Sequence, residues 1–140
     1  MGVILDSSVI IFAERRGHSM PQFLAGVTAI SGDQNAALSA VGLTELVHGM
    51  YRAKTEETVS RRRAFLHELL EAITVYPYTK ETAMLAGRLD GEQAAKGIVI
   101  PFPDLLIGAT ALSIGYSVLT TNMRHFGLIP GLQVLPFQAG

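Results

Sequence analysis

The feature of this sequence that most restricts its fold is the alternation of short apolar runs with longer segments of helical periodicity. Five runs have the length and apolar character of buried strands: residues 2–5, 37–41, 74–76, 117–120 and 132–136. Six segments carry helical spacing or helix-start and helix-stop residues: about residues 8–16, 22–30, 43–52, 56–73, 80–96 and 104–114. Strands separated by helices favour a parallel sheet that is covered on both faces. We therefore expect one three-layer α/β domain over residues 1–140, with a mostly parallel sheet of four to five strands flanked by helices.

The composition supports a packed domain and excludes several other classes of protein. Apolar side chains make up 49% of the 140 residues, which is too many for a disordered chain. There is no cysteine, which excludes a disulfide framework and a thiolate metal site and fits a cytoplasmic protein. No run of about 18 apolar residues is present, so we expect no membrane span. The net charge of −1 means that any RNA-binding surface must be a local one.

Acidic side chains fall where strands end and helices begin. Asp6 follows the first apolar run, Glu45 is expected in the first turn of the helix after the second run, and Asp104 opens the helix before the fourth. In an open parallel sheet, binding sites form at the carboxyl ends of the strands. Carboxylates gathered there would repel one another, and a hard divalent cation with oxygen ligands removes that penalty. Such a cation can activate water against a phosphodiester.

Each of these acids also has an ordinary structural interpretation. Asp6 could cap the helix that follows it, as short polar side chains often do. Glu45 and Asp104 could stabilise a helix start through the helix dipole, and Pro103 is typical of a first helical turn. The spacing alone therefore leaves both interpretations open.

The local sequences around the acids resemble one known family. Four motifs carry the resemblance, in the order that the family shows: residues 3–11, 38–46, 103–111 and 119–126, the last with its tail at 129–132. They are similar to the motifs of the PIN-domain family, in particular to its VapC-type toxins from VapBC toxin–antitoxin systems. The resemblance implies a metal-dependent endoribonuclease, a hydrolase of RNA phosphodiester bonds. It implies Mg²⁺ or Mn²⁺ as the cofactor, with Asp6, Glu45 and Asp104 as the metal ligands.

Other positions follow from the same resemblance. Asn122 matches a place where many members carry an acid, so here the site has one negative charge fewer, and we expect Asn122 to support the site from its edge. Ser7 and Thr120 match polar positions that orient ligands or water. Arg124 and His125 are candidate contacts to RNA or phosphate, and a plain surface role is the alternative.

The resemblance also implies partners: a cognate antitoxin, an RNA substrate and a second copy of the chain in a homodimer. A non-catalytic PIN-like module that binds RNA or protein is the alternative function. The sequence disfavours other phosphate-handling enzymes. Ser8 stands where a haloacid-dehalogenase type of phosphotransferase needs its second Asp, and no GxxxxGK[ST] phosphate loop is present.

Overall fold

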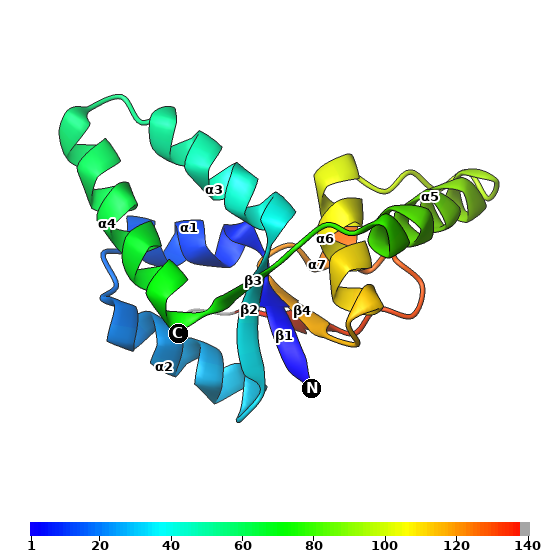
Figure 1. Cartoon of the computed structure of the whole chain (residues 1–140), viewed down its shortest axis with the longest axis horizontal. Helices are drawn as coiled ribbons and strands as arrows, with labels where there is room; N and C mark the ends of the chain where they lie inside the picture. The colour runs from blue at the N-terminus through cyan, green and yellow to red at the C-terminus, as the bar shows by residue number, and fades with distance from the viewer. Residues whose placement is uncertain (138–140) are drawn as a thin grey trace.

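The computed structural model describes residues 1–137 and has a central sheet between helices (Figure 1). The strands are β1 (Gly2–Leu5), β2 (Asn35–Ser39), β3 (Thr74–Tyr76), β4 (Ser117–Thr120) and β5 (Val134–Pro136). The helices are α1 (Ser7–Arg15), α2 (Met20–Ser31), α3 (Ala40–Tyr51), α4 (Glu56–Ala72), α5 (Lys80–Ala94), α6 (Phe102–Ser113) and α7 (Met123–Phe126). Within residues 1–137, no helix is long and apolar enough to cross a membrane.

The sheet has the order β3-β2-β1-β4-β5, and every pair of neighbouring strands is parallel. The chain builds the sheet outward from β1 in one direction through β2 and β3, and then returns to the other side of β1 with β4 and β5. The strand order therefore reverses between β1 and β4. The carboxyl ends of these two strands are the place where this class of sheet forms binding sites.

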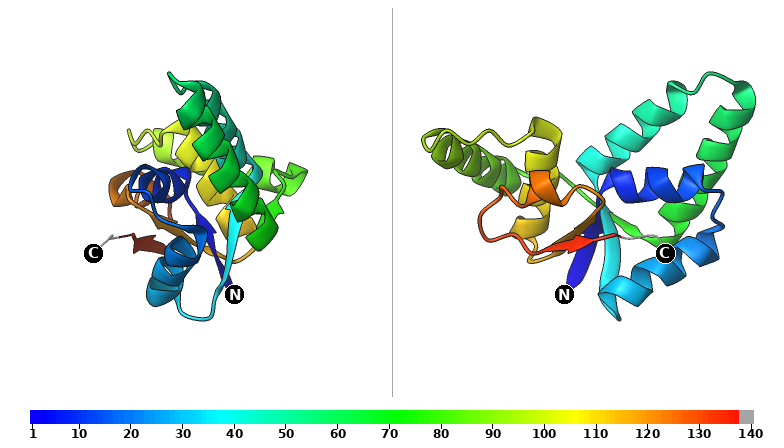
Figure 2. Two further views of the ribbon diagram at one scale, coloured as in Figure 1. Left: turned by 90° about the vertical axis from the view of Figure 1, so that its left-hand side faces the viewer. Right: turned by 180° about the vertical axis from the view of Figure 1, so that it is seen from behind.

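Alternate residues of the strands point into two separate cores. Val3, Leu5 and Leu119 pack with α1, α2 and α4 on one face. Ile4 and Val118 pack with α5, α6 and α7 on the other face. Figure 2 shows the two groups of helices on opposite sides of the sheet, with α3 and α4 forming a hairpin that extends away from it. The expected three-layer fold with parallel strands is confirmed.

The boundary between β2 and α3 differs from the expectation. The strand ends at Ser39 and the helix begins at Ala40, because the buried Ser39 hydroxyl accepts a hydrogen bond from the Gly42 N–H at 2.9 Å and caps the helix. The expected first turn for Glu45 is therefore wrong, since Glu45 lies in the second turn of α3. Two smaller differences are the single-turn helix α7, which was not among the expected helices, and the later start of β5 at Val134.

Candidate active site at the carboxyl edge of the sheet

Asp6 joins the ends of the two central strands. Its backbone N–H donates to the Leu119 carbonyl at 2.9 Å, which continues the pairing of β1 with β4. Its side chain is only 4% exposed, and Oδ2 accepts hydrogen bonds from the hydroxyls of Ser8 at 2.7 Å and Thr120 at 2.8 Å. Asp6 occupies the N-cap position of α1 without making a side-chain cap hydrogen bond. The carboxylate therefore faces the end of β4, and the capping interpretation does not describe it.

Thr120 and Ser8 hold this arrangement together. Thr120 is fully buried, and its hydroxyl accepts the Asn122 N–H at 2.9 Å while it donates to Asp6. The Ser8 hydroxyl also accepts the Thr121 N–H at 3.2 Å. Sequence reasoning missed Ser8 as a site residue. The signal that could have found it is its place two residues after Asp6, in the first turn of the helix.

Glu45 is tied to the start of α1. The Ser7 hydroxyl donates to Glu45 Oε1 at 2.8 Å, so that α1 and α3 meet beside Asp6. The resemblance matched Ser7 to a polar position near the site, and the structure places its hydroxyl directly on the Glu45 carboxylate.

Asp104 lies in the first turn of α6 and faces α7. Its Oδ2 is 2.7 Å from His125 Nδ1, and the side-chain amide of Asn122 is 2.8 Å from the same nitrogen. The sequence offered His125 only as a candidate contact to RNA or phosphate and did not predict its pairing with Asp104, because the contact joins positions 21 residues apart. Arg124 is exposed on α7, and no ion pair joins it to any of the described residues.

The three carboxylates are close enough to disturb one another. Burial raises the pKa of Asp6, the hydrogen bonds from Ser8 and Thr120 oppose that rise, and the charge of Asp104 adds to it. Burial also raises the pKa of Glu45, and the charges of Asp6 and Asp104 add to this rise.

The donor set suits a hard divalent cation, because it consists of carboxylate oxygens in a partly buried place. Within residues 1–137, no three acidic, His or Cys side chains are arranged so that they could hold a metal ion together as they stand. Instead, each acid has its own hydrogen-bond partners. Asp6 contacts Ser8 and Thr120, Glu45 contacts Ser7, and Asp104 contacts His125. The shared metal site therefore stays a prediction.

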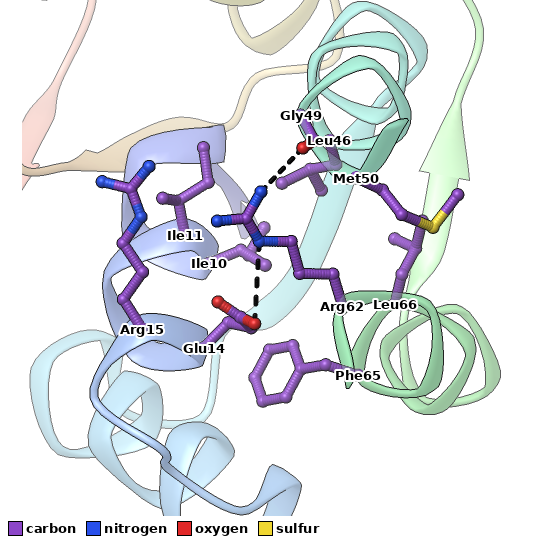
Figure 3. Close-up of a pocket in the computed structure, with 10 residues that line it drawn as sticks. All are labelled: Ile10, Ile11, Glu14, Arg15, Leu46, Gly49, Met50, Arg62, Phe65 and Leu66. Atoms are coloured by element: carbon purple, nitrogen blue, oxygen red, sulfur yellow. Dashed lines mark hydrogen bonds and ion pairs between the residues drawn. The ribbon is translucent and has the colours of Figure 1, made fainter. Parts of the chain in front are cut away.

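A groove lies between α1, α3 and α4 (Figure 3). It is open to solvent, and most of its lining is apolar, including Ile10, Leu46 and Phe65. The same two helices, α1 and α3, carry Ser7 and Glu45 nearer to their amino ends, and the groove itself is lined by none of the three acids Asp6, Glu45 and Asp104.

One buried acid lines this groove. Glu14 is 6% exposed, and its Oε1 accepts a hydrogen bond from Arg61 Nε at 3.1 Å and lies 3.8 Å from Arg62 Nε. Arg62 also donates to the Gly49 carbonyl at 2.8 Å, so its side chain links α1, α3 and α4 (Figure 3).

Comparison with known proteins identifies a family and a fold. The PIN domain family model matches residues 3–130. The chain is 35% identical over 135 residues to a protein named Ribonuclease VapC1 from Rickettsia felis, with 96% of each chain covered. It is 30% identical over 97 residues to the tRNA(fMet)-specific endonuclease VapC of Salmonella typhimurium, covering 69% of this chain and 71% of that one. The fold is similar to that in the crystal structure of VapBC2 from Rickettsia felis bound to a promoter DNA fragment, with a TM-score of 0.85, 21% identity and 99% and 100% of the two chains covered.

Proposed function

The chain belongs to the PIN-domain family, and from this membership we propose that it is a metal-dependent endoribonuclease, the toxin of a type II toxin–antitoxin pair. The observation that carries the proposal is the set of interacting carboxylates from Asp6, Glu45 and Asp104. A module that only binds RNA would gain nothing from acids that repel phosphate, whereas a metal-dependent nuclease requires them.

Asp6, Glu45 and Asp104 would hold Mg²⁺ or Mn²⁺ through oxygen atoms alone. When bound, the cation activates a water molecule and neutralises charge on the scissile phosphodiester. The hydroxyl of Ser7 orients Glu45, and the hydroxyls of Ser8 and Thr120 orient Asp6. The raised pKa values of Asp6 and Glu45 mean that metal binding releases any protons that these acids carry.

A parallel cleavage assay tests this assignment. Purified Asp6→Ala and Asp104→Ala should be close to inactive on RNA in Mg²⁺, because each loses a ligand. Asn122→Ala should retain partial activity, about 10–100-fold below the parent, because Asn122 supports the site from its edge. Circular dichroism should show that all three variants are folded. An Asn122→Ala variant as inactive as Asp104→Ala would place Asn122 among the ligands and defeat the assignment.

The partner is a cognate antitoxin, since the solved relatives include VapBC complexes. We expect one antitoxin segment to bind in the groove between α1, α3 and α4. We expect an Arg side chain of that segment to reach the carboxylates, because a planar guanidinium can donate two parallel hydrogen bonds to the two oxygens of one carboxylate. Ile11→Glu in the groove should weaken binding of the antitoxin. Val99→Glu, at a position that is 79% exposed and outside the groove lining, should leave it unchanged. Equal affinities of the two variants would contradict this placement.

In this proposal the substrate is RNA, the protein forms a homodimer, and it is located in the cytoplasm. The relative from Salmonella typhimurium is named for cleavage of tRNA(fMet), so tRNA is the first substrate to test on this chain. Sedimentation of the purified protein measures the oligomeric state.

A further inference from the structure

We propose that His125 is a positioning residue for Asp104, and that Asn122 acts on the site through His125. The metal-binding part of this inference rests on the proposed function, but the contact itself does not. His125 Nδ1 lies 2.7 Å from Asp104 Oδ2 and 2.8 Å from the terminal amide of Asn122. The side chain of Asp104 is 17% exposed and that of His125 is 38% exposed, so the pair is only partly covered.

The protonation of the ring follows from its neighbours. An ionised carboxylate only accepts hydrogen bonds, so Nδ1 must carry the hydrogen that it shares with Asp104. A nitrogen that carries this hydrogen cannot also accept one from Asn122. The structure places Asn122 Nδ2 2.8 Å from this nitrogen. The contact is a hydrogen bond only if the amide is turned so that its oxygen faces the ring and shares the Nδ1 hydrogen, and we assign that orientation from the hydrogen-bond network.

This geometry fixes Asp104 in two ways. The N–H of His125 would hold Oδ2 in one orientation while Asp104 served as a ligand to a metal ion, which is how outer partners orient a ligating carboxylate. The backbone of Asn122 is itself held, because its N–H donates to Thr120 Oγ1 at 2.9 Å. Since Thr120 also donates to Asp6, one chain of side-chain contacts joins the two acids. Asn122 thus lies between the end of β4 and His125, and its side chain reaches Asp104 only through the imidazole.

The first test reads the contact without metal. NMR of protein labelled with ¹⁵N-histidine should show His125 with its proton on Nδ1, and Asp104→Ala should change these ring signals. The signals of His67, which is exposed on α4 and pairs with Glu71 at 3.0 Å, should be unaffected and serve as the control. Unchanged His125 ring signals in Asp104→Ala would overturn the contact.

The second test measures Mn²⁺ affinity without RNA, from the electron paramagnetic resonance signal of free Mn²⁺. His125→Leu should bind Mn²⁺ about 10–100-fold more weakly than the parent, because Asp104 loses its orienting donor. His125→Asn should recover most of the affinity, because the Asn side-chain N–H can take the place of Nδ1–H. His67→Ala should match the parent. Thermal unfolding should show that each variant is folded.

A double-mutant cycle tests the role of Asn122. If Asn122 acts through His125, Asn122→Ala weakens Mn²⁺ binding in the parent and has no further effect in His125→Leu. Equal losses in both backgrounds would show that Asn122 acts on the metal site directly and would overturn this half of the proposal.

The outcomes separate this inference from the proposed function. A parent protein that binds no Mn²⁺ would refute the proposed metal site and the orienting role together, while NMR would still decide whether the contact of His125 with Asp104 exists. Normal binding by the parent and an equal affinity of His125→Leu would refute only the positioning role of His125.

Discussion

Thr120→Val is the sharpest test of how the site is held together. Thr120 is fully buried, donates to Asp6 Oδ2 at 2.8 Å and accepts the Asn122 N–H at 2.9 Å. Valine has a similar shape, so the substitution removes both hydrogen bonds with little change in packing. The backbone and the Ser8 hydrogen bond to Asp6 stay in place.

The expected loss in the free energy of unfolding is about 2–3 kcal/mol at pH 7. A hydrogen bond to a charged group contributes about 1.5–3 kcal/mol, and a neutral one about 0.5–1.5 kcal/mol. The first range alone gives most of the expected loss, because the hydrogen bond to Asp6 is the charged one. Thr120→Ser is the matched control: it keeps the hydroxyl, loses one methyl group and should cost only about 1 kcal/mol.

Urea unfolding in EDTA measures both variants, and the urea dependence should be the same for each if only native-state contacts change. The loss in Thr120→Val should also shrink as the pH falls, since a protonated Asp6 receives only a neutral hydrogen bond. Stabilities of the Val and Ser variants within about 0.5 kcal/mol of each other at pH 7 would refute the reasoning.

Two further changes test the electrostatics and the packing beneath the site. The raised pKa of Asp6 means that its ionised form destabilises the metal-free fold, so Asp6→Asn should be more stable than the parent at pH 7. In urea unfolding, this difference in stability should shrink as the pH falls through the raised pKa and disappear near pH 4. A difference that grows as the pH falls would contradict this reasoning. A Cβ on Gly108, one turn after Asp104 in α6, would overlap Ile129 Cδ1. That methyl group ends a flexible side chain but is buried, so it must shift within the core, and Gly108→Ala should cost about 1 kcal/mol, the low end for overpacking, in spite of its better helix propensity. Ile129→Val removes that Cδ1, and the double variant should therefore lose less stability than the sum of the two single variants.

The parts of the fold that follow from local pattern were predictable. Each apolar run contains a strand, although residues 40 and 41 of the second run belong to α3 and β5 begins only at Val134. The pattern is clearest in β1 and β4, where helices on both sides of the sheet bury every residue. The place of Asp6 after a strand and of Asp104 in a first helical turn also follows from adjacent residues. Glu45 was misplaced by one turn, because Ser39 serves both as the end of the strand and as the helix cap, and apolar pattern alone does not separate these roles.

The contacts between distant elements were not predictable from local pattern. His125 reaches Asp104 only because the single turn α7 packs against α6, and one helical turn carries no periodic signal. Glu14 is a similar case. Its burial depends on Arg61 and Arg62, which are 47 or more residues away on α4 and look like a solvated charge run in the sequence.

The central position of β1 has a consequence for the order in which the nuclease can come into being. Synthesis proceeds from the amino terminus, and β1 and Asp6 emerge first. Leu5 pairs with Leu119, and the partner of Asp6 across the sheet is Thr120, 114 residues later. A growing chain that has passed residue 104 therefore has all three acids but neither the strand β4 nor the Thr120 hydroxyl that holds Asp6. The Asp6 contacts can assemble only when nearly the whole chain has been made, so we expect an interrupted product of translation to lack an ordered site.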